Sequence, residues 1–228
     1  MQSTRQTAKL LEMAEEAGAD GITAHLREDR RHISDEDINR LVETLSVPLN
    51  FEMAATGEMQ KIALRHKPHA VCIVPEKREE RTTEGGLDVV QDDNRLAHFI
   101  APLREAGSRV SIFIAADKRQ IDAAKRIGAQ VIELHAGAYC DLHAEGRFKE
   151  SDAELERLRE MSAYAYSLGL EVHVGHGLTY ETVKPVAAFP EVMELNIGHF
   201  LIGEAIFLGL QPAISEMRRL MDEARGLL

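Results

Sequence analysis

The stretch Arg126–Glu133, RIGAQVIE, shows the unit from which the chain is built. A helical pattern ends at Gly128, and an apolar strand pattern begins two or three residues later. Glycine suits this junction because it accepts the left-handed conformation that closes many helices. The junction recurs as EAGADGIT (16–23), EAGSRVSI (105–112) and SLGLEVHV (167–174). Repeated helix-to-strand units predict a parallel sheet with right-handed crossovers.

Strand-like segments recur along the whole chain, each a short apolar run between helical patterns. Seven are expected: Gly21–Leu26, Leu49–Ala54, His69–Val74, Arg109–Ala115, Gln130–His135, Glu171–Val174 and Met193–Ile197. Capping patterns at Ser34, Asp117–Gln120 and Ser151–Glu154 mark three of the helix starts. The alternation favours a (β/α)8 TIM barrel over an open doubly wound sheet, with residues 1–228 forming a single domain.

The strand count falls one short of the eight that such a barrel needs, and a helical pattern precedes the first strand. We therefore expect the first β-strand of the barrel to be missing from this sequence. Either the barrel is incomplete, or the sequence lacks its natural N-terminus.

Composition excludes several classes of function. The formal net charge of −11 argues against a nucleic-acid or anionic-membrane partner, which would require a basic face. The two cysteines have no CxxC spacing, as expected for structural thiols in a reducing cytoplasm. No apolar run approaches the length of a membrane span.

Polar residues share one face of four expected strands, because side chains alternate along a strand. The apolar face must meet the outer helices, so the polar face should point into the barrel, near the end where active sites of this fold lie. Carboxylates beside histidines in such a place suit acid/base chemistry, although interior hydrogen bonding alone is the alternative. The residues are Thr23, His25, Asn50, Glu52, Glu133, His135, Glu194 and Asn196.

Two features indicate anionic ligands. Glycine-rich junctions at 175–177 and 198–199 follow the last two strands, where helix N-termini bind phosphate in many barrels, although a tight turn is the simpler interpretation. Arginines and a histidine follow the first strand between 27 and 32; we expect one or two of these cations to meet ligand, and Glu28 and Asp29 to pair with others. The polar segment Pro75–Asp88 is either a lid or a mobile surface loop.

A metal site is not expected. The sequence has no HExxH motif, and the spacing of His135, Cys140, Asp141 and His143 matches no familiar metal site.

Six segments, in order, closely resemble motifs of the pyridoxine 5′-phosphate synthase family, the ring-closing enzymes of vitamin B6 synthesis. They are HLREDRRHI (25–33), NFEM (50–53), VPEKREERTTEGGLDV (74–89), IELHAG (132–137), GHGLTY (175–180) and ELNIGHFLIG (194–203). The resemblance implies a (β/α)8 barrel that assembles into octamers. It also implies condensation of two phosphorylated small-molecule substrates, 1-deoxy-D-xylulose 5-phosphate and 3-amino-1-hydroxyacetone 1-phosphate, with no metal or organic cofactor.

The resemblance also implies roles for individual residues. His25 and Glu52 would accept protons, His176 would donate one, and Glu133 would stabilise charge in the transition state. The ligands of the deoxyxylulose phosphate would be Arg27, His32 and Thr82, and those of the amino-ketone phosphate would be Gly177, Gly198 and His199.

The sequence departs from the family pattern in three places. The first strand with its NxDH motif and the following arginine-rich segment is absent, His173 stands where asparagine is common, and Ala115 replaces an acid. Two alternatives to the synthase therefore stay open. One is a non-catalytic homologue that keeps phosphate binding or oligomer assembly, and the other is a different phosphosugar barrel enzyme, such as an isomerase.

Overall fold

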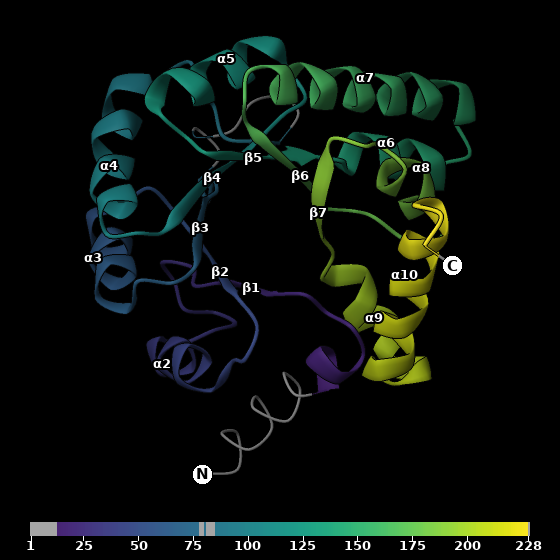
Figure 1. Ribbon diagram of the computed structural model, residues 1–228, viewed down its shortest axis with the longest axis horizontal. Coiled ribbons are helices and arrows are strands. Elements are labelled where there is room, and N and C mark those ends of the chain that lie inside the picture. Colours follow the sequence, from purple (N-terminus) through teal and green to yellow (C-terminus); the bar gives the residue numbers. More distant parts are fainter. Residues whose placement is uncertain (1–12, 78–79, 81–84, 228) are drawn as a thin grey trace.

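The computed structural model describes residues 13–77, 80 and 85–227 (Figure 1). Within this part, seven parallel strands form one sheet whose spatial order is the order of the sequence. Each expected strand is confirmed to within one residue at either end. The strands are β1 Ile22–His25, β2 Leu49–Met53, β3 Ala70–Ile73, β4 Arg109–Ile114, β5 Val131–His135, β6 Glu171–Gly175 and β7 Val192–Asn196.

The sheet curls into the arc of a TIM-type barrel, with β1 and β7 at its two ends (Figure 1). The Thr23 hydroxyl of β1 donates a 2.7 Å hydrogen bond to the Asn196 side chain of β7, so side chains from the two end strands meet. Helices α9 (His199–Leu208) and α10 (Leu210–Ala224) pack beside β7, and Ala14 and Ala17 pack against Ile214 of α10. Helical residues from both ends of the chain thus flank the two end strands.

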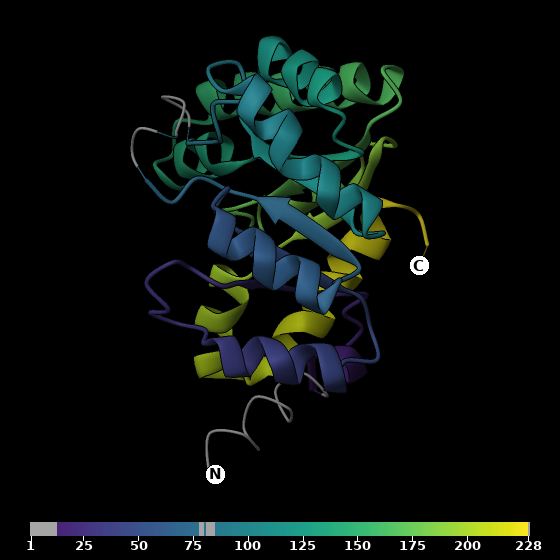
Figure 2. The same cartoon turned by 90° about the vertical axis from the view of Figure 1, so that its left-hand side faces the viewer.

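The helices surround the sheet, and Figure 2 shows α2, α3 and α4 following one another along one side. Their bounds are α2 Asp35–Thr44, α3 Gly57–His66, α4 Asp93–Glu105, α5 Lys118–Ile127, α6 Gly137–Ala144, α7 Phe148–Ser167, α8 Val183–Ala187, α9 His199–Leu208 and α10 Leu210–Ala224. The first expected helix lies mostly outside the described residues. Among the described residues, none of the helices combines the length and the apolar character that crossing a membrane requires.

Three helix caps are predicted from the sequence, and the structure shows each of these positions. Ser34 forms a reciprocal capping box with Asp37, as its position indicates. Asp117 caps α5, but its expected partner Gln120 is buried and accepts a hydrogen bond from the Val89 backbone instead. Ser151 is not a cap, because α7 begins earlier and its hydroxyl donates to the Tyr139 carbonyl. A local cap pattern is overridden when tertiary packing offers the side chain another buried partner.

The strand faces follow the predicted alternation. Outward side chains such as Phe51, Ile112 and Leu134 are almost completely buried beneath the helices. A β-bulge between β6 and β7 pairs Val172 with Val192 and His173 with Glu194, which leaves Met193 unpaired and 68% exposed. After the bulge, Glu194 and Asn196 pair with the inward positions 173 and 175. The interior of the barrel is therefore polar near the carboxyl ends of the strands.

Candidate active site

Three ionisable side chains from three strands converge inside the barrel. Glu52 on β2, Cys72 on β3 and Glu133 on β5 each bring a ligand-type atom within 4.8 Å of the other two. Glu133 is 2% exposed and Cys72 is fully buried, whereas the Glu52 side chain keeps 22% of its surface exposed. Two carboxyl groups, which repel each other when both are ionised, thus share a poorly solvated space.

Glu133 is held by donors on both sides. The Asn196 amide donates to its Oε2 at 3.0 Å, and the Cys72 thiol lies 3.8 Å from the same oxygen. Gly175, on the intervening strand β6, makes room for this carboxyl group, because a Cβ atom at position 175 would overlap its Oε1. The glycine junction at 175–177 is therefore needed for close approach, apart from any role in a turn.

Burial raises the pKa of Glu133 well above its ordinary value of 4.5, and the nearby charges of Glu52 and Glu194 raise it further. Burial also raises the pKa of Glu52, against the opposing effect of His25. Carboxyl groups displaced in this direction can hold or transfer protons near neutral pH. The shared space inside the barrel is therefore suited to proton transfer.

His25, at the end of β1, lies between two carboxylates. Its Nδ1 is 3.9 Å from Glu52 Oε2, and its Nε2 is 3.0 Å from Glu76 Oε1. Glu76 follows β3, and its side chain is 5% exposed. The predicted meeting of His25 and Glu52 is confirmed as a contact of two neighbouring strands, whose register pairs the two residues.

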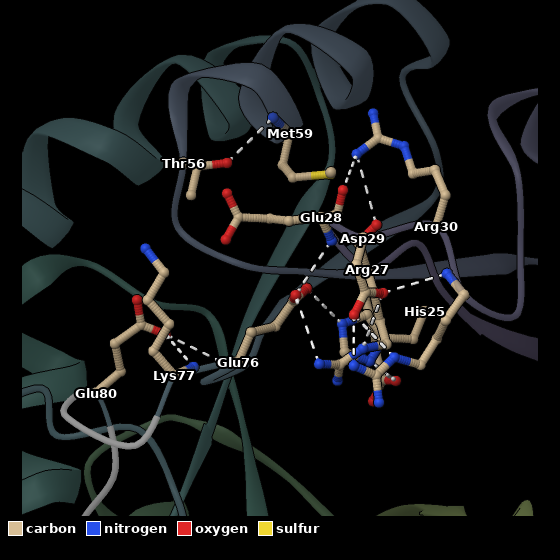
Figure 3. Close-up of polar contacts among 12 residues, drawn as sticks. His25, Arg27, Glu28, Asp29, Arg30, Thr56, Met59, Glu76, Lys77 and Glu80 are labelled. Carbon is tan, nitrogen blue, oxygen red and sulfur yellow. Dashed lines mark hydrogen bonds and ion pairs between the residues drawn. The ribbon is translucent and has the colours of Figure 1, made fainter.

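The cations after β1 are mostly paired (Figure 3). Arg30 binds Asp35 and Glu58, and Arg31 binds Asp29 at 2.6 Å. Arg27 makes longer contacts, 3.5 Å to Asp29 and 3.9 Å to Glu76, and its buried Nε has no hydrogen-bond partner. His32 is exposed. The expectation that Asp29 pairs with neighbouring arginines is confirmed, whereas Glu28 contributes through its backbone carbonyl, which accepts from Arg30.

A second group of residues gathers after β5 and β6. The His135 and His176 rings stack at 4.7 Å between centroids, with Phe113 edge-on to His135. His176 has a φ of +70° and is exposed, and Gly177 follows with a φ of +94°. A positive φ at a non-glycine residue is uncommon and occurs often at functional sites.

The two glycine-rich junctions lie at neighbouring strand ends. The His176 backbone amide donates to the Asn196 carbonyl at 3.4 Å, so the end of β6 adjoins the end of β7. Gly198 and His199 then begin α9, and both are exposed. The free amides of a helix N-terminus suit an anion.

The segment Pro75–Asp88 is described only at 75–77, 80 and 85–88, and Thr82 lies outside the described residues. Both described ends are anchored. Glu76 contacts His25, and the Leu87 amide donates to the Phe113 carbonyl at 2.8 Å. A side chain at Gly86 would overlap the backbone of Ile114 and Ala115. These contacts place residues 75–77 and 85–88 beside the candidate site.

Possible metal ligands come together inside the barrel. Within the described ranges, Glu52, Cys72 and Glu133 are the group whose ligand atoms converge. The possible ligands considered from the sequence, His135, Cys140, Asp141 and His143, do not form such a group. Cys140 contacts Thr182 instead, and His143 approaches Glu181. Thiolate and carboxylate ligands suit Zn²⁺, but the same carboxyl groups also suit metal-free proton transfer.

Sequence reasoning missed Glu76 and Cys72. Glu76 belongs to a loop rich in charges, where nothing in the local pattern separates a buried carboxylate from its solvated neighbours. Cys72 is an isolated cysteine on an apolar strand. Its inward position follows from strand alternation, but its contact with Glu133, 61 residues further along the chain, does not.

The sequence matches the family model described as pyridoxal phosphate biosynthesis protein PdxJ over residues 3–223. This chain belongs to that family. It is 82% identical to the pyridoxine 5′-phosphate synthase of Ruegeria pomeroyi and 79% identical to that of Roseobacter denitrificans. Each alignment covers 94% of this chain and 86% of the relative. The Caulobacter sp. relative of the same name is 60% identical, over 96% of this chain and 89% of its own.

Solved structures with low identity share the fold. KGPDC from Streptococcus mutans superimposes with a TM-score of 0.68 at 12% identity, covering 97% of this chain and 93% of its own. Phosphoribosyl anthranilate isomerase from Thermus thermophilus gives a TM-score of 0.60 at 14% identity, covering 97% and 95%. These likenesses confirm the α/β barrel architecture of the PdxJ-family chain.

Proposed function

We propose that this chain is a pyridoxine 5′-phosphate synthase. The reaction condenses 1-deoxy-D-xylulose 5-phosphate with 3-amino-1-hydroxyacetone 1-phosphate and releases phosphate and water. Ring formation from an amine and two carbonyl partners moves protons at several steps, so several acid/base groups must surround one space. The observation that carries the proposal is the convergence of His25, Glu52 and Glu133, from three strands, inside the barrel.

The proposed proton acceptors are His25 and Glu52, whose side chains approach within 3.9 Å. Glu133 would stabilise charge that develops in the transition state, and the Asn196 amide and the Cys72 thiol beside its Oε2 hold its carboxyl group in position. His176 would donate a proton to a leaving group, and its stacking on His135 gives the ring a fixed orientation. None of these roles requires a metal or an organic cofactor.

Two anion sites are proposed for the two substrate phosphates. Arg27, His32 and Thr82 would hold the deoxyxylulose phosphate, and the incompletely paired guanidinium of Arg27 supports this assignment. Gly177, Gly198 and His199 would hold the phosphate of the amino-ketone. The adjoining ends of β6 and β7 and the start of α9 support this second site.

We further propose that residues 1–228 act as one domain within a cytoplasmic homo-octamer. A single continuous sheet supports the single domain. Apolar side chains on α9 support assembly, because Ile202, Ile206 and Phe207 are 61%, 78% and 82% exposed. Light scattering of the purified chain measures the assembly state, and a monomer at micromolar concentration contradicts this part of the proposal.

The direct test of the activity is an assay of this 228-residue chain with both substrates, following pyridoxine 5′-phosphate by absorbance. Product should form only when both substrates are present, and phosphate should be released in equal amount. A folded chain that binds both phosphates without forming product supports the non-catalytic homologue instead. Turnover of one phosphosugar alone supports an isomerase.

A further inference from the structure

We propose that Glu76 is a positioning residue that fixes the tautomer of His25, with the proton on Nε2 and the lone pair of Nδ1 directed toward Glu52. The kinetic part of this inference rests on the proposed function, whereas the tautomer itself does not. Glu76 is the first buried carboxylate of the segment after β3, and its contacts are drawn in Figure 3.

The surroundings of Glu76 contain hydrogen-bond donors. Its Oε1 lies 3.0 Å from His25 Nε2, and its Oε2 accepts the backbone amide of Glu28 at 3.1 Å. The Arg27 guanidinium approaches Oε2 at 3.9 Å. An ionised carboxylate only accepts hydrogen bonds, so the imidazole nitrogen that faces it must carry a proton.

The second nitrogen of the ring then has a defined state. When Nε2 carries the proton of a neutral imidazole, Nδ1 is an acceptor. Nδ1 lies 3.9 Å from Glu52 Oε2, which is too long for a hydrogen bond between them. A substrate proton between His25 and Glu52 would therefore face an unprotonated Nδ1 that can accept it. When Nδ1 accepts that proton, the negative charge of Glu76 stabilises the imidazolium ion.

The position of Glu76 is itself constrained. Its backbone amide and that of Lys77 both donate to Glu80 Oε2, at 3.0 and 3.1 Å. These bonds tie the backbone of Glu76 and Lys77 to the side chain of Glu80. The backbone of Glu76 is thus fixed by Glu80, and its carboxylate is fixed by the Glu28 amide. Both constraints give Glu76 the rigidity that a positioning residue needs.

Glu76→Gln is the most direct test, because the hydrogen-bond donors around Glu76 determine how the glutamine side chain must be oriented. The Glu28 amide and the Arg27 guanidinium require an oxygen at the Oε2 position. The NH2 group of glutamine must then occupy the Oε1 position and donate to His25 Nε2. This moves the ring proton to Nδ1, so the substitution should reverse the tautomer without changing the size of the side chain.

Long-range ¹H–¹⁵N spectra of the full chain with ¹⁵N-labelled histidine distinguish the two tautomers, and the His25→Gln spectrum assigns the signals. The wild-type ring should carry its proton on Nε2, the Glu76→Gln ring on Nδ1, and the Glu76→Asp ring again on Nε2. A wild-type ring protonated on Nδ1 overturns the proposal without any variant. A folded Glu76→Gln protein that keeps the Nε2 proton also overturns it.

Kinetics give an independent measurement. Glu76→Gln should lower kcat by about 10²–10⁴-fold with a smaller change in KM, the scale typical for loss of an oriented acid/base group. Glu28→Gln is the matched control, because it removes the same charge from a side chain that points away from His25 in Figure 3. It should stay within about threefold of wild type. Equal losses in both variants would contradict a specific role for Glu76.

The two proposals fail separately. If the wild-type chain forms no product while its His25 ring shows the expected tautomer, the synthase assignment fails and the positioning role stands. If the wild type is active and Glu76→Gln, shown by circular dichroism to be folded, is equally active, the positioning role fails alone. Should Glu76→Gln not fold, the wild-type tautomer and the kcat of Glu76→Asp, expected to be reduced but measurable, decide the matter.

Discussion

Asn196 on the last strand donates a 3.0 Å hydrogen bond to the carboxyl group of Glu133, two strands away. The contact passes over Gly175 of β6, whose lack of a side chain leaves the path open. The Asn196 oxygen accepts from Thr23 of β1, so the amide is oriented with its nitrogen toward Glu133. A buried carboxyl group is thereby supported by strands from both ends of the sheet.

Glu133→Gln should stabilise the protein at neutral and alkaline pH. Because burial raises the folded-state pKa above the unfolded value of 4.5, the folded chain binds this proton more tightly. The resulting stability is present below the unfolded pKa and is lost as the pH rises through the folded pKa. Glutamine does not titrate, so thermal denaturation should show a Tm gain of several degrees at pH 8 and a much smaller gain at pH 5. A gain that is equal at both pH values would contradict the raised pKa.

Gly175→Ala should destabilise the protein by about 1–3 kcal/mol, because the new methyl group overlaps the Glu133 carboxyl oxygen. Urea denaturation measures the loss. The control is Gly57→Ala on α3, where an added Cβ has no neighbour within 4 Å, and little change or slight stabilisation is expected.

The double variant Gly175→Ala/Glu133→Ala separates the proposed clash from a general backbone effect. Removing the carboxyl group should recover most of the loss caused by alanine at 175, which appears as a coupling energy in the double-mutant cycle. Strict additivity of the two substitutions would show that Gly175 is required for another reason.

Glu52→Gln should abolish pyridoxine 5′-phosphate formation while leaving the fold intact, because the side chains are nearly the same size. A proton acceptor lost in this way lowers kcat by about 10²–10⁴-fold. Circular dichroism and the assay with both substrates measure the two outcomes. A folded variant with normal turnover would remove Glu52 from its proposed role.

Arg27→Gln should raise the KM for 1-deoxy-D-xylulose 5-phosphate by about 10–100-fold with a smaller effect on kcat, since a charge-assisted bond to phosphate is worth about 1.5–3 kcal/mol. Arg31→Gln is the control, because Arg31 is exposed and already paired with Asp29. If both arginines contribute equally, the incomplete pairing of Arg27 has no bearing on substrate binding.

The departure at His173 has a structural explanation that the sequence did not provide. Its ring points into the barrel, with Nε2 2.8 Å from Glu171 and Nδ1 3.3 Å from Glu194. The neighbouring pair Arg109–Glu171 adds a cation to the same layer. The substitution is therefore matched by acidic residues on two strands.

The sequence by itself determined the alternation of helices and strands, the parallel order and the inward face of each strand. These features are local, because helix-closing glycines and the two-residue period of a strand act over a few neighbouring positions, as at Gly128 and along Ile132–Leu134. The family motifs also point to His25, Glu52 and Glu133 as candidate site residues.

Only the tertiary structure decided which of these groups meet and what state they are in. The contacts of His25 with Glu76 and of Glu133 with Cys72 and Asn196 join residues 51 to 63 positions apart. The raised pKa of Glu133 depends on its burial and on the charges of Glu52 and Glu194, which are also distant in the sequence. Distances and desolvation at that range are set by the curvature of the whole sheet, which no short segment encodes. The chemistry of a side chain is local, but its environment is a property of the fold.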